Sequence, residues 1–135
     1  MGYYRLTVKN KFENLIYEDK AITSLRKAEK SAWFIFNSET YEDSPDLFRV
    51  PASFTGAVQM SETNPQQKNF AWGRSEVVHF TNRDGKALQG ALFYPAGYEP
   101  GKKYPMIVYI YEIRSNVVNR YVTPSPRSPY NTTNY

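Results

Sequence analysis

The chain has 135 residues, enough for one ordinary domain, and its composition of 41% hydrophobic and 22% charged residues is typical of a globular protein. The absence of cysteine excludes disulfides, thiolate metal sites and cysteine nucleophiles within this sequence. The net charge of +4 comes from basic residues scattered among acidic ones. A nucleic-acid-binding protein would concentrate that charge, so we expect no nucleic-acid partner.

Membrane, cofactor and metal functions are not indicated either. There is no run of 18 apolar residues, so we expect no transmembrane helix and no membrane partner. The opening MGYYRLTVKN lacks the apolar h-region of a signal peptide, and nothing in the sequence assigns a compartment. One histidine, together with acidic residues that lack ligand spacing, predicts no metal site, and we expect no cofactor.

The first two thirds of the chain predict short strands separated by turns. The stretches YYRLTVKN and ENLIYED are strand candidates, and residues 32–36 and 46–50 predict two more, the last ended by Pro51. Between them, Ile22, Leu25 and Ala28 have helical spacing without a cap, so we predict a loop or short turn over residues 21–30. The dipeptides Ser44-Pro45 and Asn64-Pro65 indicate turns.

A hairpin is the clearest local prediction. Residues 76–81 and 87–94 are two strand-like runs around Asp84-Gly85, where glycine supplies the positive φ that hairpin turns require. The short carboxylate of Asp84 is expected to bond the local backbone. Gly90, inside the second run, suggests a bulge or a close backbone approach.

The run MIVYIY, residues 106–111, has a different character. Six consecutive apolar or aromatic residues predict a strand of a sheet that is covered on both faces. The sequence after Arg114 is rich in proline and predicts an extended loop or tail. The fold class is therefore mainly β, with short strands of the kind found in sandwiches, barrels or propeller blades followed by one buried strand of a second architecture.

Two longer stretches bear a family resemblance. TYEDSPDLFRV, followed by NPQQKNFAWGRSEVVHFTNRDGKALQGALFYPAGYEPGKKYPMIVYIYE, resembles the prolyl oligopeptidase family of serine peptidases, in its dipeptidyl-peptidase and acylaminoacyl-peptidase branches. The resemblance covers about half of the chain, from Thr40 to Glu112. It implies the last strands of a β-propeller blade in residues 1–68, then the first hairpin and an early strand of an incomplete α/β-hydrolase sheet in residues 69–135.

The implied activity is hydrolysis of short peptides by acyl transfer, with a peptide substrate in the parent enzyme. That chemistry needs a serine on a Gly-x-Ser-x-Gly elbow, a histidine base and an orienting aspartate. Ser125 and Ser128 lack flanking glycines, and the single histidine, His79, lies in the first hairpin. We therefore expect a fragment of a peptidase that is catalytically incomplete, with no nucleophile, base or acid of its own.

One catalytic contribution remains open. Alignment by the Tyr-Pro pair places Tyr111 where relatives of the dipeptidyl-peptidase type have a tyrosine that donates its phenol hydrogen to the oxyanion. Here Glu112-Ile113-Arg114 replaces the usual Gly-Gly-Pro, so Tyr111 is either that donor or a packed aromatic. Glu39 and Glu42 could be proposed as carboxylates that bind a substrate amine, but we assign both to solvent.

Two alternatives stay beside this interpretation. The chain could be a standalone β-rich module that binds peptide or carbohydrate on a face containing Trp33 and Trp72, although their apolar neighbours favour core positions for both. It could also be a non-functional remnant of a truncated reading frame. If residues 106–111 lack sheet partners, we further expect either self-association through this exposed strand or its pairing with the hairpin of residues 76–94 as a third strand.

Overall fold

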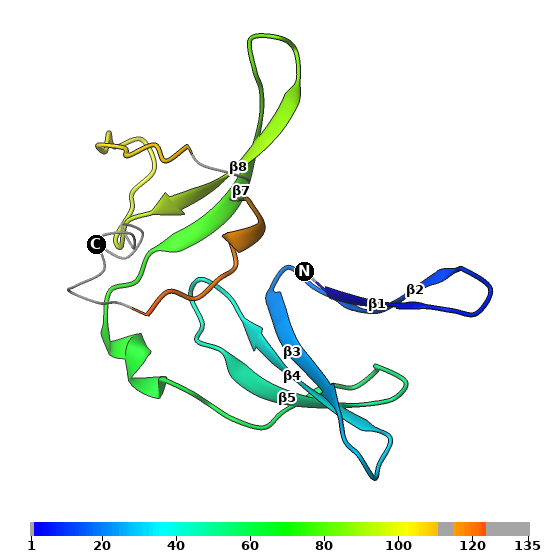
Figure 1. The fold of residues 1–135 in the computed structure, drawn as a ribbon. Coiled ribbons are helices and arrows are strands. Elements are labelled where there is room, and N and C mark those ends of the chain that lie inside the picture. Colours follow the sequence, from blue (N-terminus) through cyan, green and yellow to red (C-terminus); the bar gives the residue numbers. More distant parts are fainter. Residues whose placement is uncertain (1, 111–114, 124–135) are drawn as a thin grey trace.

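The structure, a computed structural model, describes residues 2–110 and 115–123 and is mainly β, with three separate antiparallel sheets (Figure 1). The elements in chain order are β1 Gly2–Leu6, β2 Phe12–Tyr17, β3 Ala21–Lys27, β4 Trp33–Glu39, β5 Asp46–Pro51, β6 Val58–Gln59, the 3₁₀ helix η1 Pro65–Asn69, β7 Arg74–Thr81, β8 Ala87–Tyr94 and the 3₁₀ helix η2 Ser115–Val117. The strands expected near the N-terminus, at residues 32–36 and at residues 46–50 are therefore confirmed, with small shifts of their bounds.

The largest sheet has four strands in the order β3-β4-β5-β6, so each strand pairs with the next one along the chain. Its inner face carries the core, formed by Ile22, Phe36 and Val50 together with Ile16 of β2. Phe36 stacks on Phe48 of the neighbouring strand, with ring centroids 5.5 Å apart. Such cross-strand aromatic pairs stabilise an antiparallel sheet beyond the area that they bury.

The prediction of a loop over residues 21–30 is wrong, because residues 21–27 form β3. The strand contains an irregularity between Thr23 and Arg26, and Ser24 has a φ of 58°. An extra residue in a strand changes the side-chain alternation at that point. Ile22 and Leu25 therefore both face the core although they are three residues apart, which explains the apparently helical spacing.

The β1–β2 hairpin rests on β3 at one end and projects away from it at the other (Figure 1). At the base, Ile16 joins the core, and the Tyr3 hydroxyl accepts a hydrogen bond from the backbone N–H of Leu25 at 3.3 Å. Toward the far loop the apolar side chains Leu6, Val8 and Phe12 are exposed. Among the described residues, tertiary packing holds the base of this hairpin and leaves these side chains near the loop uncovered.

The predicted hairpin of β7 and β8 is confirmed, with Gly85 at a φ of 78°. The side chain that closes its loop is Asn82 rather than Asp84. Asn82 Oδ1 accepts the backbone N–H of Asp84 at 3.0 Å and that of Lys86 at 2.8 Å. Gly90 marks neither of the two features expected there. The pairing runs without a shift from Arg74↔Tyr94 to Thr81↔Ala87, so there is no bulge, and a Cβ at Gly90 would meet only side-chain atoms at 3.6 Å and beyond, so no backbone approaches closely.

The predicted strand at residues 106–111 is not formed over its described part, residues 106–110. Their side chains are 58% to 90% exposed, so the segment lacks the two covering layers that its apolar sequence requires. Tyr111 lies outside the described residues. The early strand of a hydrolase sheet is thus a sequence expectation without a counterpart in the described fold.

Residues 115–123 return from beyond this segment and pass between the β7–β8 hairpin and the four-stranded sheet (Figure 1). We call this stretch the strap. Val118 in the strap is buried, and its carbonyl accepts the hydroxyl hydrogen of Ser75 on β7 at 2.7 Å. On the other side, Asn119 Nδ2 donates to Asp19 Oδ1 at 2.8 Å. The strap therefore contacts both parts of the molecule.

Replacing Gly85 with valine should lower the free energy of unfolding by about 1 kcal/mol or more, because a β-branched residue is strained at positive φ. Urea denaturation measures the loss. Gly90→Ala is the matched control in the same hairpin, since a Cβ there would meet only ordinary contacts at 3.6 Å and beyond. Equal losses from both variants would contradict the conformational explanation.

Candidate functional site

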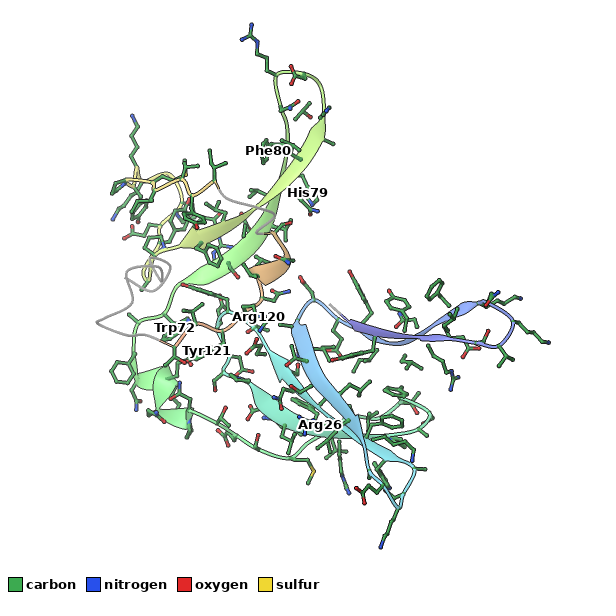
Figure 2. The ribbon with its side chains drawn as sticks, viewed as in Figure 1. Arg26, Trp72, His79, Phe80, Arg120 and Tyr121 are labelled. Atoms are coloured by element: carbon green, nitrogen blue, oxygen red, sulfur yellow. The ribbon has the colours of Figure 1, made fainter. Side chains whose placement is uncertain are left out.

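The residues expected to bear on acyl transfer are not assembled in the described structure. Tyr111, Ser125 and Ser128 lie outside the described residues. His79 is exposed on β7 opposite Gln89 (Figure 2), and Ser75 on the same strand donates its hydroxyl hydrogen to Val118. Four residues of strand separate their backbones by about 13 Å. His79 is therefore outside hydrogen-bonding reach of Ser75.

Two further expectations concern metals and membranes. Among the described residues, no group of three His, Asp or Glu side chains is arranged to hold a metal ion. In the same part of the chain, no helix has the length and apolar character needed to cross a membrane.

The most elaborate side-chain arrangement lies where the four-stranded sheet meets the β7–β8 hairpin. We call this region the junction, and its central residue is Trp72. The indole Nε1 of Trp72 donates to the backbone carbonyl of Tyr41 at 2.9 Å. The indole ring is parallel to that of Tyr121 from the strap, with an interplanar angle of 2° and centroids 5.5 Å apart (Figure 2). Tyr41 is itself buried, and its ring packs on that of Phe93 on β8, with the ring centroids 5.2 Å apart.

The four-stranded sheet and the β7–β8 hairpin are joined by residues 60–73, which we call the connection. Asn64 links the connection to the strap. It adopts a left-handed conformation, with a φ of 52°, immediately before η1. Its side-chain amide donates to the Tyr121 hydroxyl at 2.7 Å and to Gln67 Oε1 at 3.3 Å. Burial raises the pKa of the Tyr121 phenol, as does the charge of Asp43, while the hydrogen bond from Asn64 opposes this rise.

A cavity of about 590 Å³ opens at the junction. Its lining includes the rings of Tyr41, Phe70, Trp72, Tyr94 and Tyr121 and the amides of Asn64, Gln66 and Gln67. Gly73 forms part of the wall, and a Cβ at this position would lie 2.1 Å from the carbonyl oxygen of Tyr94. Only glycine lets the connection pass this close to the end of β8.

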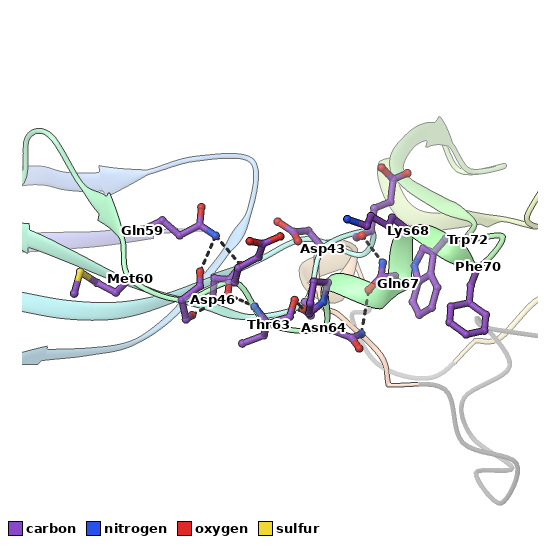
Figure 3. A pocket seen from close by; sticks show the side chains of 15 residues that line it. Asp43, Asp46, Gln59, Met60, Thr63, Asn64, Gln67, Lys68, Phe70 and Trp72 are labelled. Atoms are coloured by element: carbon purple, nitrogen blue, oxygen red, sulfur yellow. Dashed lines mark hydrogen bonds between the residues drawn. The ribbon is translucent and has the colours of Figure 1, made fainter.

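A second and more polar hollow of about 840 Å³ lies beside it, between the turn at residues 42–46 and the segment at residues 59–72 (Figure 3). Asp46 lines this hollow and is only 3% exposed. Asp46 Oδ1 accepts from Ser61 Oγ and from the backbone N–H of Thr63, both at 2.8 Å, and Oδ2 accepts from Gln59 Nε2 at 2.9 Å. A carboxylate with three donors is satisfied, so we assign Asp46 a structural role.

Ser44 also bonds to the segment that Asp46 holds. Its hydroxyl lies 2.7 Å from Thr63 Oγ1 and 3.0 Å from the Thr63 carbonyl oxygen. Ser44 and Asp46 thus bind the connection from both ends of one Ser-Pro-Asp sequence. These bonds fix where the chain leaves the four-stranded sheet.

The assignment of Glu39 to solvent is wrong, whereas Glu42 is exposed as expected. Glu39, the last residue of β4, is only 9% exposed. Burial raises the pKa of its carboxyl, and the positive charge of Arg120 in the strap opposes the rise. The sequence around Glu39 does not indicate that this side chain is buried. Arg120, in the strap near it, lies about 80 residues further along the chain.

The two tryptophans differ from the predicted core positions. Trp33 is 40% exposed at the start of β4, with the Arg49 guanidinium 4.9 Å from its ring centroid. Trp72 is half-buried in the junction. Trp72 bonds Tyr41, two positions after β4 ends, so about 25 Å of extended backbone separates Trp33 from this contact. The two indoles cannot form one ligand-binding face.

A tyrosine group lies beyond the junction, at the end of the β7–β8 hairpin. The Arg74 guanidinium is 4.0 Å from the ring centroid of Tyr94, and Tyr98 packs on the same ring at 4.5 Å. The Tyr94 hydroxyl donates to Glu76 Oε1 at 2.5 Å. This hydrogen bond is the main cause that raises the pKa of the Tyr94 phenol. The contacts are local and stabilise the end of the hairpin.

Sequence reasoning missed Tyr121 and Asn64 as site residues. Asn64 was recognised only as part of a turn, and Tyr121 lies in a stretch without periodicity. Both become significant only through a contact that spans 57 residues of sequence. Comparison with known proteins adds no assignment: no protein-family model matches the sequence, and no curated protein shows significant similarity to it.

Asp46→Asn should lower the free energy of unfolding by about 2 kcal/mol, because an amide nitrogen would face donors that now bond to a carboxylate. Urea denaturation measures this. Asp43→Asn, at an exposed position of the same turn, should change stability by less than about 0.5 kcal/mol. If both variants lose equal stability, the charge of the turn matters rather than the bonds of Asp46.

Glu39→Gln should stabilise the protein at neutral pH and lose this advantage in acid. A folded-state pKa that is raised favours the protonated carboxyl, so its stabilising contribution is present at low pH and disappears as the pH rises through the folded pKa. Urea midpoints for both proteins at about pH 4 and pH 7 test this, since an unperturbed glutamate titrates near the lower value. Glu42→Gln is the exposed control. If the Glu39→Gln variant is less stable than the original protein only at pH 7, the attraction between Glu39 and Arg120 is larger than the cost of burying the charged carboxylate.

Proposed function

We propose that the chain is part of a serine peptidase of the prolyl oligopeptidase family, spanning the junction between the end of a β-propeller and the start of an α/β-hydrolase domain. In this proposal residues 1–68 belong to the propeller and residues 69–135 to the peptidase domain. The parent enzyme hydrolyses short peptides by acyl transfer. The chain alone is catalytically incomplete.

The observation that carries the proposal is the change of architecture at residues 60–73. Before it lies a four-stranded antiparallel sheet whose strands follow sequence order, a topology found in propeller blades. After it lies an isolated hairpin, followed by the exposed apolar residues 106–110. The resemblance predicts a domain boundary in the same place.

Residues within the two stretches that resemble the family also have structural roles that suit a domain boundary. Ser44 and Asp46, from the SPDL sequence, bind the connection as it leaves the sheet. Trp72 and Gly73, from the WG sequence, hold it against Tyr41 and beside Tyr94 where the hairpin begins. These roles support the resemblance without depending on catalysis.

The proposed chemistry requires parts that this sequence does not contain. A serine hydroxyl needs a base within hydrogen-bonding reach, and His79 is the only histidine. Tyr111 could supply an oxyanion donor in the parent enzyme, but a donor acts only on an oxyanion that a nucleophile generates. The length of the coding region therefore discriminates: a continuing reading frame with a Gly-x-Ser-x-Gly elbow supports a peptidase, and an immediate stop favours a standalone module or a remnant.

The purified chain should hydrolyse no chromogenic proline or alanine peptide at a rate typical of this family. A fluorophosphonate probe, which labels activated serines, should leave it unmodified because no base activates its hydroxyls. The probe reaction and the hydrolysis assay are run in parallel. Stoichiometric labelling of one serine, with turnover lost when that serine becomes alanine, would reveal a different triad and refute the proposal of an incomplete enzyme.

We also propose that the isolated chain self-associates through residues 106–111. Residues 106–110 are exposed and apolar, and both edges of the β7–β8 hairpin are open in the described sheet. Sedimentation velocity should show concentration-dependent association that Ile107→Lys reduces. Val8→Lys is the control, because Val8 is also a highly exposed aliphatic residue. A monomer at every concentration, or an equal effect of both substitutions, would argue against this interface.

A further inference from the structure

We propose that the β1–β2 hairpin binds the surface of a membrane that contains anionic lipids. The hairpin has no part in the peptidase chemistry proposed above, so the two proposals are independent. The expectation of no membrane partner came from the lack of a membrane-spanning run in the sequence. Attachment to a membrane surface needs no such run, because an amphipathic element inserts a single apolar face into the interface.

One face of the projecting hairpin is apolar and uncovered (Figure 1). Tyr3 and Ile16 pair across the two strands and point toward the core. Because side chains alternate between the faces of a strand, the residues on either side of this pair point away from the core. They form what we call the apolar face, whose four large side chains are 52% to 76% exposed: Tyr4, Leu6, Phe12 and Tyr17. Exposed apolar patches of this kind mark interaction surfaces.

The charge at the loop end of the hairpin selects an anionic partner. Arg5 and Glu13 neutralise each other, since Arg5 Nε donates to Glu13 Oε2 at 3.0 Å. Lys9 and Lys11 in the exposed loop make no ion pair among the residues that the structure describes. Each lysine held near an anionic lipid surface strengthens binding by about fivefold. The loop therefore carries two positive charges beside the apolar face.

The order of side chains along the hairpin matches the layers of a membrane interface. Leu6, Phe12 and the fully exposed Val8 lie toward the loop, whereas the rings of Tyr4 and Tyr17 pack on each other nearer the base. Tyrosine prefers the headgroup level, and apolar side chains prefer the acyl chains below it. Two residues of strand place the Leu6 level about 7 Å beyond the Tyr4 level. Interfacial elements insert to a similar depth, about 5–10 Å, and lysine stems can extend back to the phosphates.

The composition of the loop end favours a lipid surface over an acidic protein. Protein interfaces are enriched in arginine and tryptophan and depleted in lysine. Here the unpaired charges are the lysines Lys9 and Lys11, and the arginine, Arg5, is held by Glu13. A second copy of the chain would bring the same two lysines to the contact, and like charges at an interface are unfavourable.

A label at the loop provides the readout. The sequence contains no cysteine, so Val8→Cys creates a single site for the environment-sensitive fluorophore nitrobenzoxadiazole. Vesicles of equal parts phosphatidylglycerol and phosphatidylcholine should raise the emission of this label and shift it to the blue, with saturation, because insertion removes the fluorophore from water. Vesicles of phosphatidylcholine alone, and soluble poly-glutamate as an acidic protein surface, should cause little change.

The β7–β8 hairpin supplies matched controls, because its loop is closed by the same pair of backbone hydrogen bonds. Phe12→Ala should weaken vesicle binding about fivefold through loss of buried apolar area, whereas Phe80→Ala, at a residue 52% exposed on β7 (Figure 2), should not. Replacing both Lys9 and Lys11 with glutamine should weaken binding by about tenfold or more. The same change at Arg83 and Lys86, in the other loop, should have little effect. Circular dichroism verifies that each variant is folded.

Four results would overturn the proposal. The first is an unchanged emission of the label at position 8 when anionic vesicles are added. The second is an equal response to phosphatidylcholine alone or to poly-glutamate, which would remove the need for anionic lipid. The third is an equal response of a label at Arg83→Cys, and the fourth is equal weakening by Phe12→Ala and Phe80→Ala. Either of the last two would mean that the chain adheres to vesicles without using the β1–β2 hairpin specifically.

Discussion

The hydrogen bond from the Trp72 indole to the Tyr41 carbonyl is the constraint on which the arrangement of the two parts depends. It attaches the start of the β7–β8 hairpin to the turn that follows β4. The same indole stacks on Tyr121, so the strap is held by the ring whose N–H holds the sheet. Tyr121 in turn accepts the amide of Asn64, which closes a chain of contacts through the connection. Without Trp72, the hairpin and the four-stranded sheet would be joined mainly by the connection and by the contacts of the strap.

The features that could be predicted from sequence are those set by nearby residues. The β7–β8 hairpin follows from two alternating runs around a glycine that needs positive φ. Strand β5 follows from the strand-like stretch DLFRV between Ser44-Pro45 and Pro51. By contrast, β3 was misread because the irregularity at Ser24 produces a three-residue spacing that imitates a helix. A bulge has no reliable signature in one sequence when neither glycine nor proline marks it.

The candidate site was less predictable, because long-range contacts form it. Trp72 was identified, but its expected position in a core differs from its half-buried position at the junction. The burial of Glu39 and the role of Tyr121 depend on the strap, which follows the apolar residues 106–110 along the chain. Apolar content correctly marked those residues as unusual, yet it could not determine whether covering layers are present. Tyr111, the residue that the family resemblance singles out, lies outside the described residues.

The strap has a consequence for the order in which the structure assembles. The contact between Asp19 and Asn119 closes a loop of 100 residues, whereas the hairpins and the four-stranded sheet use neighbouring segments. Closure of a long loop loses more chain entropy than pairing of adjacent strands, and such contacts form late. Each sheet can therefore nucleate by itself, and the strap adds its contacts to both parts last. Amide hydrogen exchange would show this order as faster exchange of the strap amides than of the amides within the sheets.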